Sequence, residues 1–176
     1  MIRRYAAIDG KGVVSVQQEP LRDPGPNEAL VEVHASLISP GTEMGGVKAR
    51  RDRPNPSAPP AEFGYQNAGV VIATGPGCDG LAVGQRVACM GIKGAAPHAT
   101  HGLTPKNLCF PIPAHVSFED AAFNHLAATA LQAIRRAELQ IGEYVAVCGL
   151  GIIGQTLCQF ARLCGCRVVG LDRLPL

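Results

Sequence analysis

The first two thirds of the chain alternate short apolar runs with clusters of glycine and proline, a pattern typical of β-rich domains. Between residues 29 and 35, Val31 and Val33 alternate with Glu32 and His34, which predicts a strand with one buried face. Similar runs predict strands at 5–8, 13–18, 29–37, 68–74, 86–90 and 108–112. Residues 1–116 are therefore expected to form a compact all-β barrel or sandwich.

The segment 40–63 is rich in proline and glycine, and no helix or strand is predicted in it. Structureless connections of this length in compact domains are usually functional, so this segment is a candidate binding loop. Its basic residues could bind a phosphate or carboxylate. The alternative is that they form a solvated face of the loop and bind nothing. These residues are Lys48, Arg50, Arg51 and Arg53.

After Pro113 the pattern changes to that of helices and buried strands. Ser117 supplies an N-cap hydroxyl ahead of Glu119 and Asp120, so connecting helices are predicted over 117–139. The apolar run 144–148 suits a strand buried on both faces of a parallel sheet. An amphipathic helix and a second strand, at 167–172, follow it, so residues 140–176 are predicted to begin an α/β domain.

Composition and charge narrow the function classes. The 176 residues carry a net charge of +2, which argues against nucleic acid as a partner. Glycine and proline make up about a fifth of the chain, below the roughly 25–30% of disordered low-complexity chains. No run approaches the roughly 18 apolar residues of a membrane span, and no apolar signal core follows the N-terminus. With seven cysteines, an odd number, we expect reduced thiols and a cytoplasmic protein.

A glycine-rich turn lies between the first predicted strand and the helix of the α/β segment. Gly149 permits a tight turn, Gly151 lets the backbone approach a pyrophosphate, and Gly154 lets helix and strand pack closely. The loop also includes Leu150, Ile152 and Ile153. Phosphates would face N–H groups at the helix start, so the loop is predicted to bind a dinucleotide. The alternative is a glycine turn that binds nothing.

Asp172 ends the second strand about twenty residues further on. A carboxylate there can accept hydrogen bonds from ribose hydroxyls and repel a 2′-phosphate, which favours NAD. The adjacent Arg173 could instead accommodate that phosphate, so NADP stays open.

Beyond this loop, the sequence resembles the medium-chain dehydrogenase/reductase family, the alcohol dehydrogenase-like proteins, from about residue 29 to 172. The motifs that carry the resemblance are ISPGTE at 38–43, GYQNAGVV at 64–71, VGQRV at 83–87, PIP at 111–113, SFEDAA at 117–122 and the glycine loop. It implies a β-rich GroES-like barrel followed by the first βαβ unit of a Rossmann domain, with substrate and nicotinamide meeting between the two. The chain looks most similar to a branch related to bacteriochlorophyllide dehydrogenases and two-domain sugar oxidoreductases.

The chain departs from the zinc-dependent members of that family. Pro40, Tyr65 and a position near Asn124 stand where those members have zinc ligands, and none of these side chains suits zinc. The four closely spaced cysteines of a structural zinc lobe are also missing from 91–98. A replacement site would have to combine Cys89, Cys109, His98 and His101, whose spacing matches no standard pattern. We therefore expect no zinc.

Without zinc, another donor must stabilise the charge on the substrate oxygen during hydride transfer. By their positions in the family motifs, Tyr65 and Thr42 are the candidate catalytic residues, and Tyr65 could equally be a core tyrosine. Thr129 matches a position that contacts the nicotinamide side of the cofactor, and could equally be an ordinary helix residue.

The resemblance predicts a zinc-independent, NAD(P)-dependent oxidoreductase acting on a small alcohol or carbonyl substrate. The family's chains are about twice as long, so we expect an N-terminal fragment with little activity alone, and a homodimer in the full-length form. Two alternatives stay open. One is a non-catalytic GroES-like module that binds a small molecule or partner, and the other is a subunit that completes its sheet with another chain.

Overall fold

The computed structural model describes residues 1–91 and 94–174. The chain divides into two compact units, Met1–Asn124 and His125–Leu176, and the division falls inside the segment 117–139. Within the described residues, no helix is long and apolar enough to cross a membrane.

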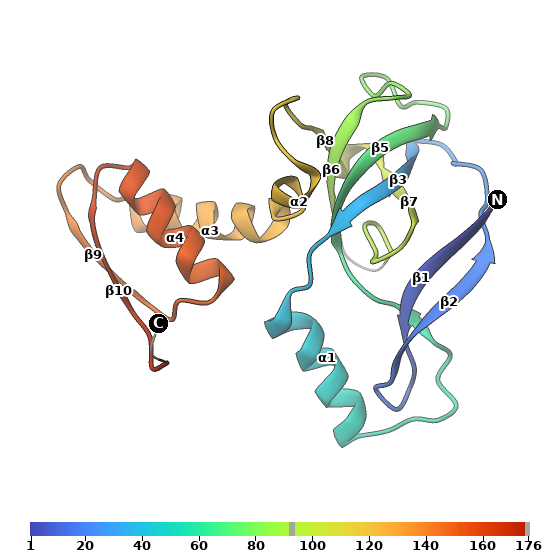
Figure 1. Ribbon diagram of the computed structural model, residues 1–176, viewed down its shortest axis with the longest axis horizontal. Coiled ribbons are helices and arrows are strands. Elements are labelled where there is room, and N and C mark those ends of the chain that lie inside the picture. Colours follow the sequence, from blue (N-terminus) through green and yellow to red (C-terminus); the bar gives the residue numbers. More distant parts are fainter. Residues whose placement is uncertain (92–93, 175–176) are drawn as a thin grey trace. The chain divides into compact units, whose positions relative to one another are not determined.

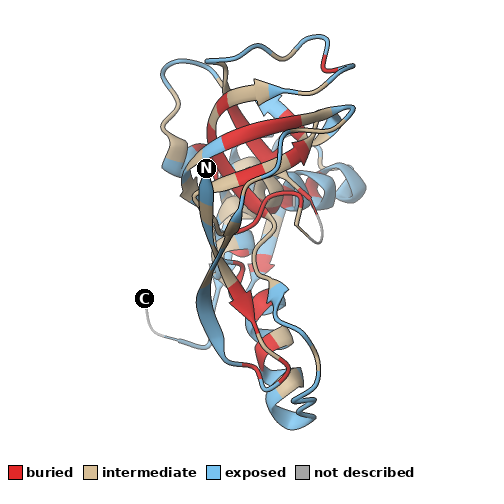
Figure 2. Cartoon of the chain, turned by 90° about the vertical axis from the view of Figure 1, so that its right-hand side faces the viewer, coloured by how far each residue is buried: buried red, intermediate tan, exposed pale blue. Residues whose placement is uncertain are grey.

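A five-stranded antiparallel sheet forms the core of the first unit (Figure 1). Its spatial order is β7 (His101–Pro105), β3 (Glu28–Ser36), β5 (Gln66–Thr74), β6 (Arg86–Met90) and β8 (Cys109–Pro111). Figure 2 shows buried residues concentrated in this curved sheet, where Val31, Val71 and Val87 are fully buried. The alternation predicted for β3 is confirmed, since Glu32 and His34 are exposed. The barrel expected from the sequence is therefore present.

A smaller antiparallel sheet lies beside it in the order β2 (Val14–Pro20), β1 (Ile2–Ile8) and β4 (Ala61–Glu62). The two sheets are joined through the segment before β7. The N–H of Ala6 donates to the carbonyl of His98 at 2.8 Å, and that of Thr100 donates to Arg4 at 2.8 Å. The 3₁₀ helix η1 (Lys106–Leu108) connects β7 to β8.

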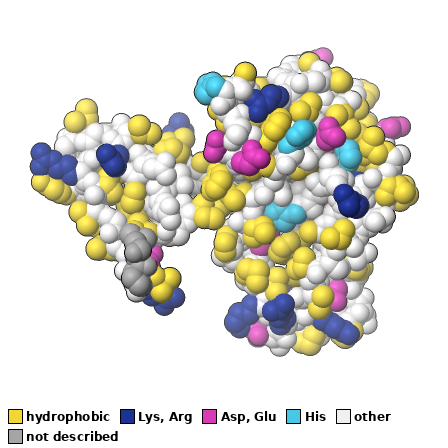
Figure 3. Space-filling view, viewed as in Figure 1, with side chains coloured by type: hydrophobic (Ala, Val, Ile, Leu, Met, Phe, Trp, Pro, Cys, Tyr) yellow, Lys and Arg dark blue, Asp and Glu magenta, His cyan; other side chains and the backbone are white. Residues whose placement is uncertain are grey.

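The prediction of a structureless loop over 40–63 is wrong for residues 40–52 and for the short strand β4. Residues Pro40–Asp52 form the helix α1, with Pro40 in its first turn and Val47 buried. Proline suits this position because its missing N–H has no partner there anyway. Lys48, Arg50 and Arg51 lie on this helix and Arg53 is its C-cap. Figure 3 shows Lys and Arg side chains gathered at the end of this helix. Lys48 pairs with Asp52 at 2.5 Å, and Arg51 donates to the carbonyl of Gly12 at 3.3 Å.

Two helices follow the barrel. The predicted cap is confirmed, because the Ser117 hydroxyl accepts the N–H of Asp120 at 2.9 Å at the start of α2 (Phe118–Ala121). The helix α3 (Asn124–Ala137) then buries Leu126, Ala130 and Ile134 on one side.

In the second unit, β9 (Tyr144–Cys148) pairs in parallel with β10 (Arg167–Leu171), and α4 (Ile152–Leu163) connects them. Ile134 of α3, Ala161 of α4 and Cys166 form the core of this unit. The prediction that β9 is buried on both faces is wrong within the described chain. Val147 is buried under α4, whereas Tyr144 on the other face is 73% exposed because no described element covers it.

Candidate functional site

The loop between β9 and α4 has the shape predicted from its glycines. Gly149 has a φ of 94°, a left-handed conformation that favours glycine, and its N–H donates to Leu171 at 2.7 Å. A Cβ on Gly154 would lie 1.8 Å from the carbonyl oxygen of Gly149, which no structure tolerates. These two glycines are therefore required by the fold of the loop itself.

Gly151 differs from its two neighbours in the motif. It is the N-cap of α4, with a φ of −67° that any residue adopts, and a Cβ placed on it would have no described atom within 4 Å. No contact within residues 1–91 and 94–174 therefore requires glycine at this position. The open space lies at the positive end of the α4 dipole, where an anion is stabilised. A pyrophosphate fits this place because it could approach the bare backbone closely.

The structure brings Asp172 to the same loop. Its Oδ2 accepts the N–H of Leu150 at 2.6 Å and its Oδ1 accepts that of Leu174 at 3.0 Å. These backbone hydrogen bonds, first that of Leu150, hold the pKa of the Asp172 carboxyl below its ordinary value. Sequence reasoning predicted Asp172 as a ligand of the ribose and missed its role in holding the loop. A carboxylate has about four lone-pair positions, so it retains capacity for ribose hydroxyls.

Four other predicted cofactor residues lie in this unit. Leu150 and Ile152 are half-buried, and Ile153 is exposed in the first turn of α4. Thr129 is exposed on α3, and its hydroxyl donates to the carbonyl of His125 at 3.0 Å. This local bond is one that helical threonines commonly make. The role predicted for Thr129 in contacting the nicotinamide stays a prediction.

The predicted catalytic residues lie in the first unit. Tyr65 is half-buried just before β5, and its carbonyl accepts the N–H of Gly91 at 3.0 Å. Gly64, directly before it, has a φ of 102°. Thr42 is exposed in the first turn of α1. Their role in polarising a substrate stays a prediction.

Sequence reasoning missed a buried pair that connects these two segments. The Glu43 side chain is only 4% exposed, and its Oε2 lies 2.8 Å from Nε2 of His98. Its Oε1 accepts the N–H of Ser39, which fixes the start of α1. A Cβ on Gly64 would lie 2.7 Å from the His98 ring, so the ring packs directly against the turn before Tyr65. The first turn of α1 and the Gly64 turn are therefore held together through one imidazole.

The thiols of Cys89 and Cys109 form a second buried pair. They face each other across β6 and β8, with the Sγ atoms 3.7 Å apart. The hydrogen bond from Cys89 to Cys109 raises the pKa of Cys89 and lowers that of Cys109. All seven cysteines are free. Among the described residues, no group of three or more His, Cys, Asp or Glu is placed to hold a metal ion.

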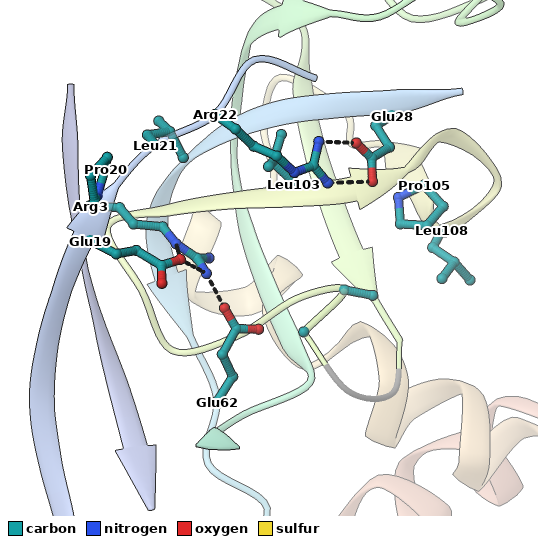
Figure 4. Close-up of a pocket in the computed structure, with 12 residues that line it drawn as sticks. Arg3, Glu19, Pro20, Leu21, Arg22, Glu28, Glu62, Leu103, Pro105 and Leu108 are labelled. Atoms are coloured by element: carbon teal, nitrogen blue, oxygen red, sulfur yellow. Dashed lines mark hydrogen bonds and ion pairs between the residues drawn. The ribbon is translucent and has the colours of Figure 1, made fainter. Parts of the chain in front are cut away.

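An open groove of about 750 Å³ lies elsewhere on the first unit (Figure 4). Figure 4 shows Arg3 directed at Glu19 and Glu62, and Arg22 at Glu28 with a shortest distance of 2.6 Å. The charged groups that line this groove thus bind one another. Neither Tyr65 nor Thr42 belongs to its lining.

A curled antiparallel barrel followed by a strand, a glycine loop, a helix and a parallel strand defines the medium-chain dehydrogenase/reductase architecture. The chain belongs to this family, because the sequence profile of the alcohol dehydrogenase GroES-like domain matches residues 25–129.

Comparison with individual proteins agrees with this family. A sorbitol dehydrogenase of Bos taurus is 27% identical over 191 residues, covering 92% of this chain and 52% of the relative. A zinc-type alcohol dehydrogenase-like protein of Schizosaccharomyces pombe is 30% identical over 172 residues, covering 91% of this chain and 49% of the relative. A mycobacterial protein solved in complex with NADPH superposes with a TM-score of 0.77 at 26% identity, covering 96% of this chain and 51% of that protein's chain. The chain thus spans about half the length of the relatives it matches.

Proposed function

We propose that the whole protein is an NAD(P)-dependent oxidoreductase that interconverts an alcohol and a carbonyl compound. The observation that carries the proposal is the loop of Gly149, Gly151 and Gly154, in which two glycines satisfy the fold and the third leaves the helix N-terminus open. A nicotinamide cofactor, when bound, supplies the hydride transfer. The dehydrogenases among the relatives support the same class of reaction.

For the cofactor, we propose NAD in preference to NADP. The Asp172 carboxylate lies beside the loop, where it would accept hydrogen bonds from the ribose hydroxyls and repel a 2′-phosphate. NADPH in the mycobacterial relative and Arg173 in this chain support the opposite preference. Titration with both nucleotides decides between them.

We assign the polarisation of the substrate oxygen to Tyr65 and Thr42, with no zinc involved. The Glu43–His98 pair holds the two segments that carry these residues, which supports their acting on the same substrate. Pro40, which precedes Thr42 in its motif, offers no zinc ligand. Small-molecule substrates, a cytoplasmic location and a homodimer of the full-length form belong to the same proposal.

A substitution at Gly151 tests cofactor binding without disturbing the fold, because no described atom lies close to the position of an added Cβ. In Gly151→Ala the added methyl group occupies the place proposed for the pyrophosphate, so NADH affinity should fall about tenfold or more while the circular dichroism spectrum stays unchanged. Gly45→Ala is the matched control, because Gly45 is equally open but lies on α1. Affinity is measured by NADH fluorescence titration of the purified chain.

Equal NADH affinity in Gly151→Ala and wild type would overturn the proposed binding mode. The catalytic part is tested in the full-length protein, by NAD(P)H turnover with a panel of alcohols, aldehydes and ketones and by its loss in Tyr65→Phe. Tight binding of a small molecule with no response to either nucleotide would favour the non-catalytic binding module instead.

A further inference from the structure

His98 has a second partner besides Glu43. Its Nδ1 lies 2.9 Å from the hydroxyl oxygen of Ser36, the last residue of β3. Ser36, His98 and Glu43 therefore form a continuous hydrogen-bonded line, with the carboxylate at its buried end and the hydroxyl at its exposed end. The three residues come from a strand end, the segment before β7 and the first turn of α1, so the fold rather than local sequence assembles them.

With Glu43 ionised and His98 neutral, each hydrogen bond in this line has one direction. An ionised carboxylate only accepts, so the proton of the neutral imidazole is on Nε2 and is donated to Glu43. In a neutral imidazole the other nitrogen, Nδ1, then holds a lone pair, and the Ser36 hydroxyl donates to it. A hydroxyl within hydrogen-bond distance of a base, with the base oriented by a third group, is the signature of an activated nucleophile.

The imidazole is held firmly in this orientation. The backbone N–H of His98 donates to the carbonyl of Phe63 at 2.9 Å, and its ring meets the Phe63 ring edge to face at 5.8 Å. The His98 side chain is 12% exposed, with Gly64 packed against the ring. The base is thus fixed by surroundings that do not involve Ser36, whose hydroxyl remains accessible.

Ser36 and His98 also line an open pocket of about 370 Å³. This volume lies at the small end of the range of ligand pockets, which suits a short acyl group. Arg4 lines the same pocket and contributes a positive charge, which would stabilise an oxyanion formed next to Ser36. Tyr5 and Val33 add apolar surface.

From this juxtaposition we propose that Ser36 is the nucleophile of a second activity, the hydrolysis of short-chain acyl esters. The Ser36 oxygen bonds to the acyl carbon while its proton passes to Nδ1 of His98, and the bond to the leaving alcohol breaks as that proton is delivered to it. Water then attacks the acyl-serine with His98 as base, which releases the acid and restores Ser36. The reaction needs no nicotinamide, so it is independent of the function proposed above.

The test uses the purified 176-residue chain without nucleotide. Hydrolysis of p-nitrophenyl acetate is followed by release of p-nitrophenol, and diisopropyl fluorophosphate, which loses fluoride on phosphorylating a serine, is located by peptide mass spectrometry. We expect the label on Ser36 and a loss of about 100-fold or more in hydrolysis in both Ser36→Ala and His98→Asn. Ser57→Ala and His115→Asn, at exposed positions outside the pocket, are the matched controls.

Each outcome decides the proposal. Label on Ser36 that disappears in Ser36→Ala, together with the loss of turnover, supports it. Absence of label, label on another serine, or turnover unchanged in Ser36→Ala overturns it. If circular dichroism shows that His98→Asn is unfolded, Ser36→Ala alone is decisive, because Ser36 is exposed and its truncation removes only the hydroxyl.

Discussion

Replacing Glu43 with alanine should destabilise the first unit far more than the loss of an ordinary surface charge. The carboxylate accepts the Ser39 N–H at 2.8 Å and lies 2.8 Å from Nε2 of His98. Both partners are buried or nearly so. Truncation at Cβ leaves two donors without their acceptor.

The size of the effect follows from those two donors. A buried donor left unsatisfied costs about 1–3 kcal/mol. Water entering the space of the lost side chain recovers part of this, so we expect a loss of about 2–4 kcal/mol in the free energy of unfolding. With a urea m-value of about 2 kcal/mol/M, the unfolding midpoint should fall by about 1–2 M. Glu43→Gln keeps one acceptor oxygen and should lose less.

The chain contains its own control. Glu32 and His34 form a Glu–His pair at 3.8 Å whose side chains are 53% and 43% exposed. Exposed pairs contribute about 0–1 kcal/mol, so Glu32→Ala should leave the midpoint nearly unchanged. The measurement is urea unfolding followed by circular dichroism. If Glu43→Ala and Glu32→Ala shift the midpoint equally, the argument from buried donors is wrong.

Two further predictions concern the titratable groups. Hydrogen bonding lowers the pKa of the Asp172 carboxyl in the folded state. The carboxylate therefore stabilises the loop fully at any pH above the pKa of Asp172 in the unfolded chain. This stabilisation is lost as the pH falls through the pKa of Asp172 in the folded chain. Amide exchange at Leu150, corrected for the intrinsic pH dependence, should therefore show less protection in acid, and Asp172→Asn should remove this pH dependence. Under native conditions iodoacetamide should modify exposed Cys148 well before the buried pair, and Cys109 before Cys89, because its pKa is lowered. Peptide mass spectrometry over time gives the order, and early modification of Cys89 would contradict it.

The features that local sequence determines were predictable. Both β6 and β9 begin and end at the predicted residues, since alternation or a continuous apolar run between turn residues specifies a strand directly. The turn of the glycine loop was predictable because the positive φ of Gly149 and the close approach of Gly154 to the Gly149 carbonyl both arise within six residues. The Ser117 cap follows from the same kind of short-range chemistry.

The features that depend on distant residues were not predictable. Glu43 and His98 are 55 positions apart, and no spacing rule connects them. The helix α1 was missed because Gly41, Gly45 and Gly46 disfavour helix, while the burial of Val47 and the partners of Glu43 stabilise it through tertiary contacts. Exposure of one face of β9 likewise depends on which elements pack there, and a strand's own sequence does not specify its neighbours.

The hydrogen bond from Leu150 to Asp172 has a thermodynamic consequence for ligand binding. Together with the bond from Gly149 to Leu171, it orders the loop without any ligand. Binding of a dinucleotide there would restrict the motion of the ligand but would hardly restrict the loop further. The conformational entropy of the protein backbone would therefore be nearly the same before and after binding. Calorimetry should then give a heat-capacity change set by the ligand's own contact area, without the large negative contribution that accompanies coupled folding.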